Sequence, residues 1–195
     1  MAQWLQYTGH DPENGPVAPG AGLRQLLEGC WPFVDTVTLS SNFDLILSPR
    51  FPPAWARREE WAALKAALCP WLVGRTTSGR WFGYGRGSTK QVRYRYRADQ
   101  GLKEALCQRY QDIFLRIPVD PSPEEQIPWF ADMCLFSRET LFFGSVSHEK
   151  EAFLYPLNRE MERHFSALPG WEICPWRDEK SRLRLGEFTW RDELK

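Results

Sequence analysis

Two adjacent residues of this chain have side chains that could carry out acid–base chemistry. They are His148 and Glu149, which follow the apolar run that ends at Val146. An imidazole beside a carboxylate can donate and accept protons near neutral pH, because histidine titrates there. Neighbouring residues in a turn often point apart, however, and no nucleophile or metal ligand accompanies this pair at a useful spacing. An enzyme with a site around His148 and Glu149 is therefore kept only as a second alternative function.

The glycine-spaced stretch 79–90 could in principle hold a phosphate group. A phosphate-binding loop has four residues between its first glycine and a Gly-Lys-Ser/Thr triplet, and a helix follows the triplet. Here the order is Gly-Ser-Thr-Lys at 87–90, and a strand-like pattern follows. The stretch is more typical of a hairpin turn.

The remaining reactive side chains predict no catalytic residue, metal site or cofactor. The three histidines have no H-x-x-x-H spacing, and Gly-x-Ser-x-Gly does not occur. The cysteines are odd in number and widely separated, with no CxxC pair, at Cys30, Cys69, Cys107, Cys134 and Cys174. Mostly buried, reduced thiols fit this pattern, so a reducing cytoplasm is the expected location.

Charge is sorted sharply at one place in a chain whose net charge is zero. Residues 61–98 hold eight basic side chains and no carboxylate. Within them, residues 92–97 read Val-Arg-Tyr-Arg-Tyr-Arg. Side chains alternate between the two faces of a strand, so Arg93, Arg95 and Arg97 are expected to share one face, with Tyr94 and Tyr96 on the other. The pattern indicates a surface that meets an anionic partner.

Three interpretations of this arginine row stay open. It could be a solvated strand face balanced by acids on neighbouring strands. It could bind an acidic protein surface, with Arg93, Arg95 and Arg97 supplying charge and with Trp81, Tyr84 and Arg86 as anchors. It could also track nucleic acid, with tyrosines and Trp81 as stacking platforms. Tyr94 and Tyr96 should point away from the arginines, and the neutral total charge also argues against nucleic acid.

The elements that position these residues predict one α+β domain. Apolar spacing indicates helices over 23–29, from Pro53 to Pro70, over 101–114 and from Leu157 to Leu168. Strands are expected as hairpins over 34–40 with 43–47 and over 81–84 with 90–97. A meander over 133–136, 141–146 and 151–155 and short strands over 171–173 and 183–188 complete the pattern. We expect a single domain over 23–195, a mainly antiparallel sheet with three to four helices packed on it, after an irregular N-terminal arm over 1–22.

Composition agrees with a globular protein and gives no sign of a membrane protein. Hydrophobic residues make up 43% of the chain and charged residues 26%, and there are ten tryptophans. The start from Met1 to Ala18 lacks the basic and apolar regions of a signal peptide, and no apolar run approaches the length of a membrane span. We therefore expect a cytoplasmic protein that does not contact a membrane.

Two segments resemble strand pairs of a known class of proteins. Residues 142–149 (Phe-Phe-Gly-Ser-Val-Ser-His-Glu), preceded by residues 129–136 (Trp-Phe-Ala-Asp-Met-Cys-Leu-Phe), are similar to strands in cytoplasmic immunity proteins of bacterial polymorphic or contact-delivered toxin systems. Such proteins act by occluding their toxin, so the resemblance implies protein binding and transfers no catalytic residue. Inhibitors of nucleic-acid-cleaving toxins tend to be acidic, whereas the concentrated charge of this chain is positive.

The sequence therefore predicts a non-catalytic protein-binding domain that acts through a basic and aromatic surface. Nucleic-acid binding by the same strand is the first alternative.

Overall fold

One antiparallel sheet organises the computed structural model, which describes residues 3–11, 15–16, 21–41, 58–83, 90–110, 112–115, 130–147, 149–174 and 182–191. The sheet has eight strands in the order β10-β1-β9-β8-β7-β4-β6-β5. Their bounds are β1 Leu5–Tyr7, β4 Thr36–Ser41, β5 Leu72–Ser78, β6 Gln91–Arg97, β7 Ala131–Ser137, β8 Thr140–Val146, β9 Glu151–Leu154 and β10 Trp171–Ile173. Two short strands, β2 (His10–Asp11) and β3 (Gly15–Pro16), pair separately.

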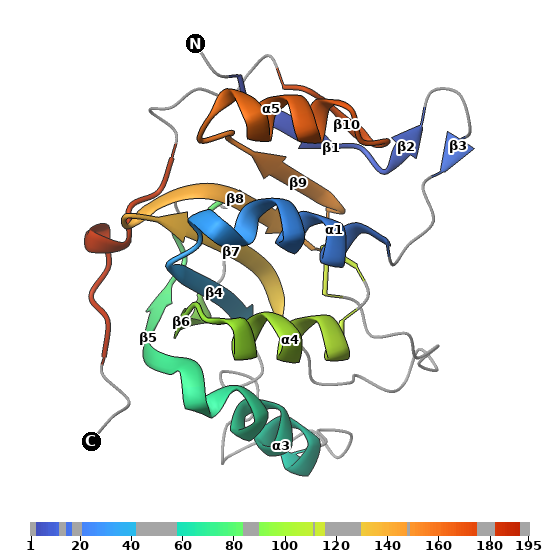
Figure 1. Cartoon of the computed structure of the whole chain (residues 1–195). Coiled ribbons are helices and arrows are strands. Elements are labelled where there is room, and N and C mark those ends of the chain that lie inside the picture. Colours follow the sequence, from blue (N-terminus) through green and yellow to red (C-terminus); the bar gives the residue numbers. More distant parts are fainter. Residues whose placement is uncertain are drawn as a thin grey trace.

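Helices pack against one face of this sheet, which confirms the predicted α+β domain. They are α1 (Ala21–Cys30), α3 (Arg58–Leu68), α4 (Gln100–Arg109) and α5 (Arg159–Ser166). Down the sheet from β10 towards β5, the helices follow in the order α5, α1, α4, α3 (Figure 1). Each contributes buried apolar side chains to a common core, for example Leu27, Trp61, Leu106 and Phe165.

Side-chain caps begin two of these helices. The Asp99 side chain accepts a hydrogen bond of 3.0 Å from the Leu102 N–H at the start of α4. The Asn158 side chain accepts one of 2.8 Å from the Met161 N–H at the start of α5. Such caps satisfy N–H groups that have no partner within the helix.

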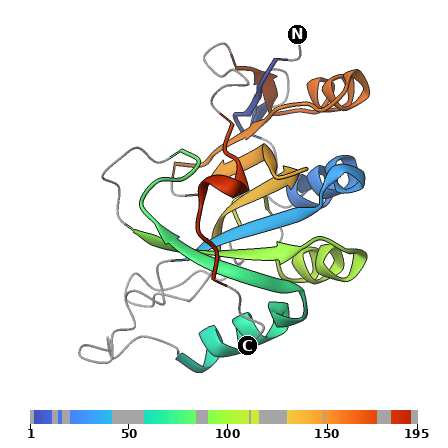
Figure 2. The ribbon, with the colours of Figure 1, turned by 90° about the vertical axis from the view of Figure 1, so that its left-hand side faces the viewer.

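The opposite face of the sheet carries a second, smaller core. A segment that we call the strap (residues 182–191) crosses this face (Figure 2), and it includes the 3₁₀ turn η4 (Leu185–Glu187). The Leu141 N–H donates to the Leu183 carbonyl at 2.9 Å, and Arg75 and Arg191 exchange two backbone hydrogen bonds of 3.0 and 2.8 Å. Strap residues Leu183 and Leu185 pack there with a cluster that includes Trp4, Trp81, Phe82, Phe136, Leu141 and Phe153.

Several predicted elements are wrong, because strand partners come from distant parts of the chain. The expected irregular arm contains β1, which lies between β9 and β10. β4 pairs along its length with β6 and β7. Residues 43–47, the predicted hairpin partner of 34–40, lie outside the described residues. β6 pairs with Leu72–Ser78 instead of 81–84. Residues 183–188 do not form the predicted strand: they contain the 3₁₀ turn Leu185–Glu187, and Arg184 forms an isolated bridge with Thr140.

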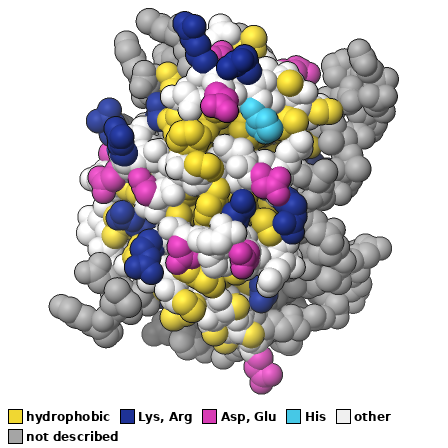
Figure 3. Space-filling model, viewed as in Figure 1, with side chains coloured by type: hydrophobic (Ala, Val, Ile, Leu, Met, Phe, Trp, Pro, Cys, Tyr) yellow, Lys and Arg dark blue, Asp and Glu magenta, His cyan; other side chains and the backbone are white. Residues whose placement is uncertain are grey.

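The helix-covered face mixes acidic and basic side chains. Figure 3 shows dark blue and magenta side chains interspersed over this face, without a broad region of one sign. Among the described residues, no helix has both the length and the apolar character needed to cross a bilayer.

Candidate binding groove

The arginine row of β6 has the predicted alternation. Val92, Tyr94 and Tyr96 belong to the core beneath the helices. Because successive side chains of a strand point to opposite faces, Arg93, Arg95 and Arg97 lie on the face that the strap crosses. Their exposure increases along the strand: Arg93 is fully buried, the Arg95 side chain is 28% exposed, and Arg97 is exposed.

The expected exposure of Arg93 and Trp81 is wrong. Arg93 has a relative exposure of 0% and Trp81 of 2%. The Arg93 guanidinium carbon lies 5.1 Å from the centre of the Trp81 ring, and Arg93 pairs in register with Ser40 on β4 and Thr76 on β5. The strap and the Trp81–Phe82 segment cover this half of the face. Arg93 and Trp81 therefore do not form an open contact surface.

The other two predicted anchors, Tyr84 and Arg86, lie outside the described residues. Their part in binding stays a prediction.

A groove lies at the Arg95–Arg97 end of the arginine row, where the strap and the Trp81–Phe82 segment no longer cover it fully. Its volume is about 460 Å³. Its walls come from the start of β4, from β5 and β6, from the turn between β7 and β8, and from the strap; they are Asp35, Thr36, Val73, Arg95, Arg97, Glu139 and Trp190. Arg95 and Arg97 are two positions apart on one strand, so their Cα atoms are separated by about 7 Å. Two cations thus lie beside one aromatic ring and two carboxylates.

Arg95 is the centre of the groove. Its guanidinium carbon lies 5.8 Å from the centre of the Trp190 ring, and its Nη2 lies 3.9 Å from Oε1 of Glu139. The Trp190 indole N–H donates a 3.0 Å hydrogen bond to the Leu185 carbonyl, which fixes the ring on the strap. Among the described residues no carboxylate forms an ion pair with Arg97. The groove therefore offers guanidinium groups beside a held aromatic surface.

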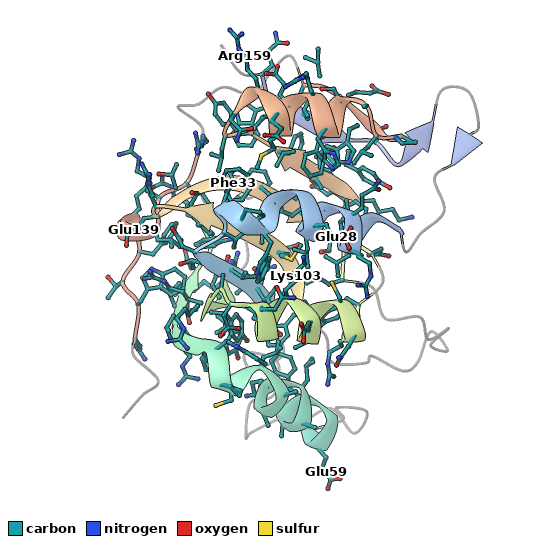
Figure 4. All side chains as sticks on the ribbon, in the orientation of Figure 1. Glu28, Phe33, Glu59, Lys103, Glu139 and Arg159 are labelled. Atoms are coloured by element: carbon teal, nitrogen blue, oxygen red, sulfur yellow. The ribbon has the colours of Figure 1, made fainter. Side chains whose placement is uncertain are left out.

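The turn that supplies Glu139 is tightly held. Ser137 pairs with Thr140, so the loop has two residues, Arg138 at φ 47° and Glu139 at φ 64°. Positive φ at both positions is typical of type I′ turns, which usually carry Asn and Gly because other residues are strained there by about 1 kcal/mol each. The Arg138 N–H donates to the Asp35 carboxylate, and the Leu185 N–H donates to the Glu139 carbonyl at 2.9 Å. Figure 4 places Glu139 beside the strap, away from Glu28 and Lys103 on the helix side.

Sequence reasoning found two members of the groove, Arg95 and Arg97, and missed three charged or aromatic ones. Asp35, Glu139 and Trp190 are far apart in the sequence and meet because β4 lies between β6 and β7 and because the strap crosses them. The only local signal was the pair of charged residues in a two-residue turn. No pattern in the sequence connects these residues with Arg95.

The structure describes only one member of the candidate acid–base pair. His148 lies outside the described residues, and Glu149 is exposed in a turn in which its N–H donates to the Val146 carbonyl at 3.1 Å. In the described part of the chain, no cluster of three or more His, Cys, Asp or Glu side chains could hold a metal ion. Two of the thiols are fully buried: burial raises the pKa of the Cys134 thiol to about 12 and raises that of Cys30 further.

Comparison with known protein families, curated proteins and solved structures finds no match to this chain.

Proposed function

We propose that this protein is a protein-binding domain without chemistry of its own, and that its contact surface is the groove at Arg95, Arg97 and Trp190. The observation that carries the proposal is the meeting of two guanidinium groups and an indole ring in one recess. Arginine and tryptophan contribute most to the binding energy of many protein interfaces. A guanidinium also matches the geometry of a carboxylate, so the partner presents an acidic surface.

The position of the groove refines the surface expected from the sequence. Arg93 is buried against Trp81, so it supports the surface without contacting the partner. Arg97 is the exposed cation and supports the rate of association, while Arg95 and Trp190 form the partly covered centre.

A toxin is the specific partner that the resemblance to immunity proteins suggests, with neutralisation by occlusion. The segments that carry this resemblance include β7 and β8, where Phe136, Phe142 and Phe143 are fully buried. They form the core of the sheet, and the groove lies at one end of their hairpin. Binding would therefore depend on the groove and not on the resembling segments themselves.

The nucleic-acid alternative has weaker support from the groove. Tyr94 and Tyr96 are buried beneath the helices, so they offer no stacking surface beside the arginines. Asp35 and Glu139 line the same recess, so the arginines do not form a continuous basic path there. A protein carboxylate needs only one of the two arginines, whereas a nucleic-acid backbone needs a continuous basic path.

Reversing the charge of Arg97 tests the proposal. Tagged protein is used to capture partners from native cell lysate, in parallel with the Arg97→Glu variant and an Arg159→Glu control on α5. Arg159 is also exposed but lies on the helix-covered face. We expect one protein that the wild type and the control retain, and that Arg97→Glu binds about tenfold more weakly or loses.

Two results would count against a protein partner at the groove. One is equal capture by Arg97→Glu and wild type. The other is recovery of nucleic acid alone, with a steep loss of binding as salt is raised.

A further inference from the structure

Glu139 occupies the place in the groove where a carboxylate from a partner would contact Arg95. We infer that the groove accepts one Glu or Asp side chain of the partner beside Arg95 and against Trp190, and that Glu139 is an internal substitute which this side chain displaces. The inference rests on the proposed function and adds the chemistry of the inserted group and the residue that competes with it.

The contact between Glu139 and Arg95 is loose. Its N···O distance of 3.9 Å is well beyond the length of a charge-assisted hydrogen bond, about 2.8 Å. The Glu139 side chain is 63% exposed, so water screens the pair strongly. The Arg95 side chain is itself 28% exposed, so an anion that enters the groove can reach its guanidinium group. Arg95 therefore keeps capacity for a better placed anion.

Displacement of Glu139 requires only a rotation of its side chain. Hydrogen bonds hold the turn from both sides, from the Arg138 N–H to Asp35 and from the Leu185 N–H to the Glu139 carbonyl. The backbone can therefore stay fixed while the exposed carboxylate swings into water. Arg95 and Trp190 are already in position, so binding orders few additional groups.

The groove also has room for more than the inserted carboxylate. Its volume of about 460 Å³ exceeds that of one acidic side chain, and Val73 and Trp190 supply apolar wall. The adjoining chain of the partner can therefore pack against Trp190 while its carboxylate meets Arg95. An aromatic ring held in this way favours a peptide segment over a free small anion.

Matched peptides test this inference by nuclear magnetic resonance. The probe is acetyl-Gly-Glu-Gly-amide, and the control is the same peptide with Gln in place of Glu. The reporter is the Trp190 indole N–H, with the Nε–H groups of Arg95 and Arg97. We expect saturable shifts of these signals with the Glu peptide and none with the Gln peptide.

Two variants separate competition by Glu139 from a general change of charge. Glu139→Gln removes the competing anion, and we expect the Glu peptide to bind about two- to fivefold more tightly, as for an exposed like-charge contact. Glu187→Gln removes the same charge from the strap at a residue that pairs with Arg80 at 3.0 Å and does not line the groove. Its affinity for the peptide should equal that of the wild type.

Equal shifts with both peptides would overturn the inference, as would unchanged or weaker binding by Glu139→Gln. Absence of peptide binding, together with partner capture that still depends on Arg97, would refute the inserted carboxylate and leave the proposed function standing. Capture that is independent of Arg97 would refute the proposed function itself.

Discussion

Arg93 shows how a single cation contributes to the fold without contacting solvent. Burying a guanidinium is unfavourable by several kcal/mol unless polar or aromatic partners compensate for lost water. The face of Trp81 lies 5.1 Å from its guanidinium carbon, and such a contact can contribute about 2 kcal/mol away from water. The long side chain also fills space between the sheet and Trp81. Arg93 therefore anchors the Trp81–Phe82 segment onto the sheet.

Substitutions at Arg93 should affect stability and not only binding. Arg93→Ala leaves a cavity beside Trp81, and we expect the free energy of unfolding to fall by about 3 kcal/mol or more. Arg93→Met refills much of the space, so its loss should be smaller, about 1 to 2 kcal/mol. Arg97→Ala, at an exposed position, should change stability by less than about 0.5 kcal/mol. Urea unfolding followed by tryptophan fluorescence measures all three, and equal stabilities of Arg93→Ala and Arg97→Ala would contradict this role.

At the scale of single residues, the sequence predicts which face of the sheet a side chain points to better than it predicts whether that side chain is exposed. The two-residue period of β6 correctly separates the arginines from Tyr94 and Tyr96. Whether each arginine meets water depends on residues 81–82 and on the strap, which ends almost a hundred residues after β6. No periodicity within the strand contains that information, so Arg93 was wrongly expected to be exposed.

The turn between β7 and β8 is the element that links the groove to the sheet. It connects two central strands, supplies Glu139 to the groove, and hydrogen-bonds to both Asp35 and the strap. Its two non-glycine residues at positive φ store backbone strain. Strain of this kind persists where surrounding contacts hold a conformation that local sequence does not favour.

Relief of that strain should stabilise the protein. Asparagine tolerates positive φ better than arginine does, so Arg138→Asn should raise the free energy of unfolding by about 0.5 to 1 kcal/mol. Arg138→Ala is the matched control, because it removes the same side chain without favouring positive φ. Thermal or urea unfolding compares the two, and an equal effect of Asn and Ala would show that φ is not the cause.

Secondary structure elements were more predictable than their partners. The meander β7-β8-β9 and helices α1, α4 and α5 follow from local apolar spacing and turns, both of which act within a few residues. The order of strands is set by burial across the whole domain. β1, with three residues, has too short a pattern to be recognised without β9 and β10 beside it.

The whole molecule has three layers: helices, sheet and a thinner cover made largely by the strap. Strap residues Leu183 and Leu185 are buried in the second core, and Phe188 and Trp190 pack against it. The same segment forms one wall of the groove. Integrity of the second core and of the candidate binding site therefore depends on one peripheral segment.

Truncation tests this dependence. A chain that ends at residue 181 loses the strap and should expose Trp81, Phe136 and Leu141 to water. We expect it to be destabilised by several kcal/mol and to bind a hydrophobic dye such as ANS. A chain that ends at residue 191 keeps every described strap contact and serves as the control. Equal stability and equal dye binding of the two truncated chains would show that the strap does not close the second core.

The place of β1 has a consequence for biosynthesis. Leu5–Tyr7 leaves the ribosome before both of its neighbouring strands, β9 and β10, which lie beyond residue 150. The β10 side of the sheet can therefore close only after β9 and β10 have been synthesised, and until then the buried side chains of Trp4 and Leu5 lack their final surroundings.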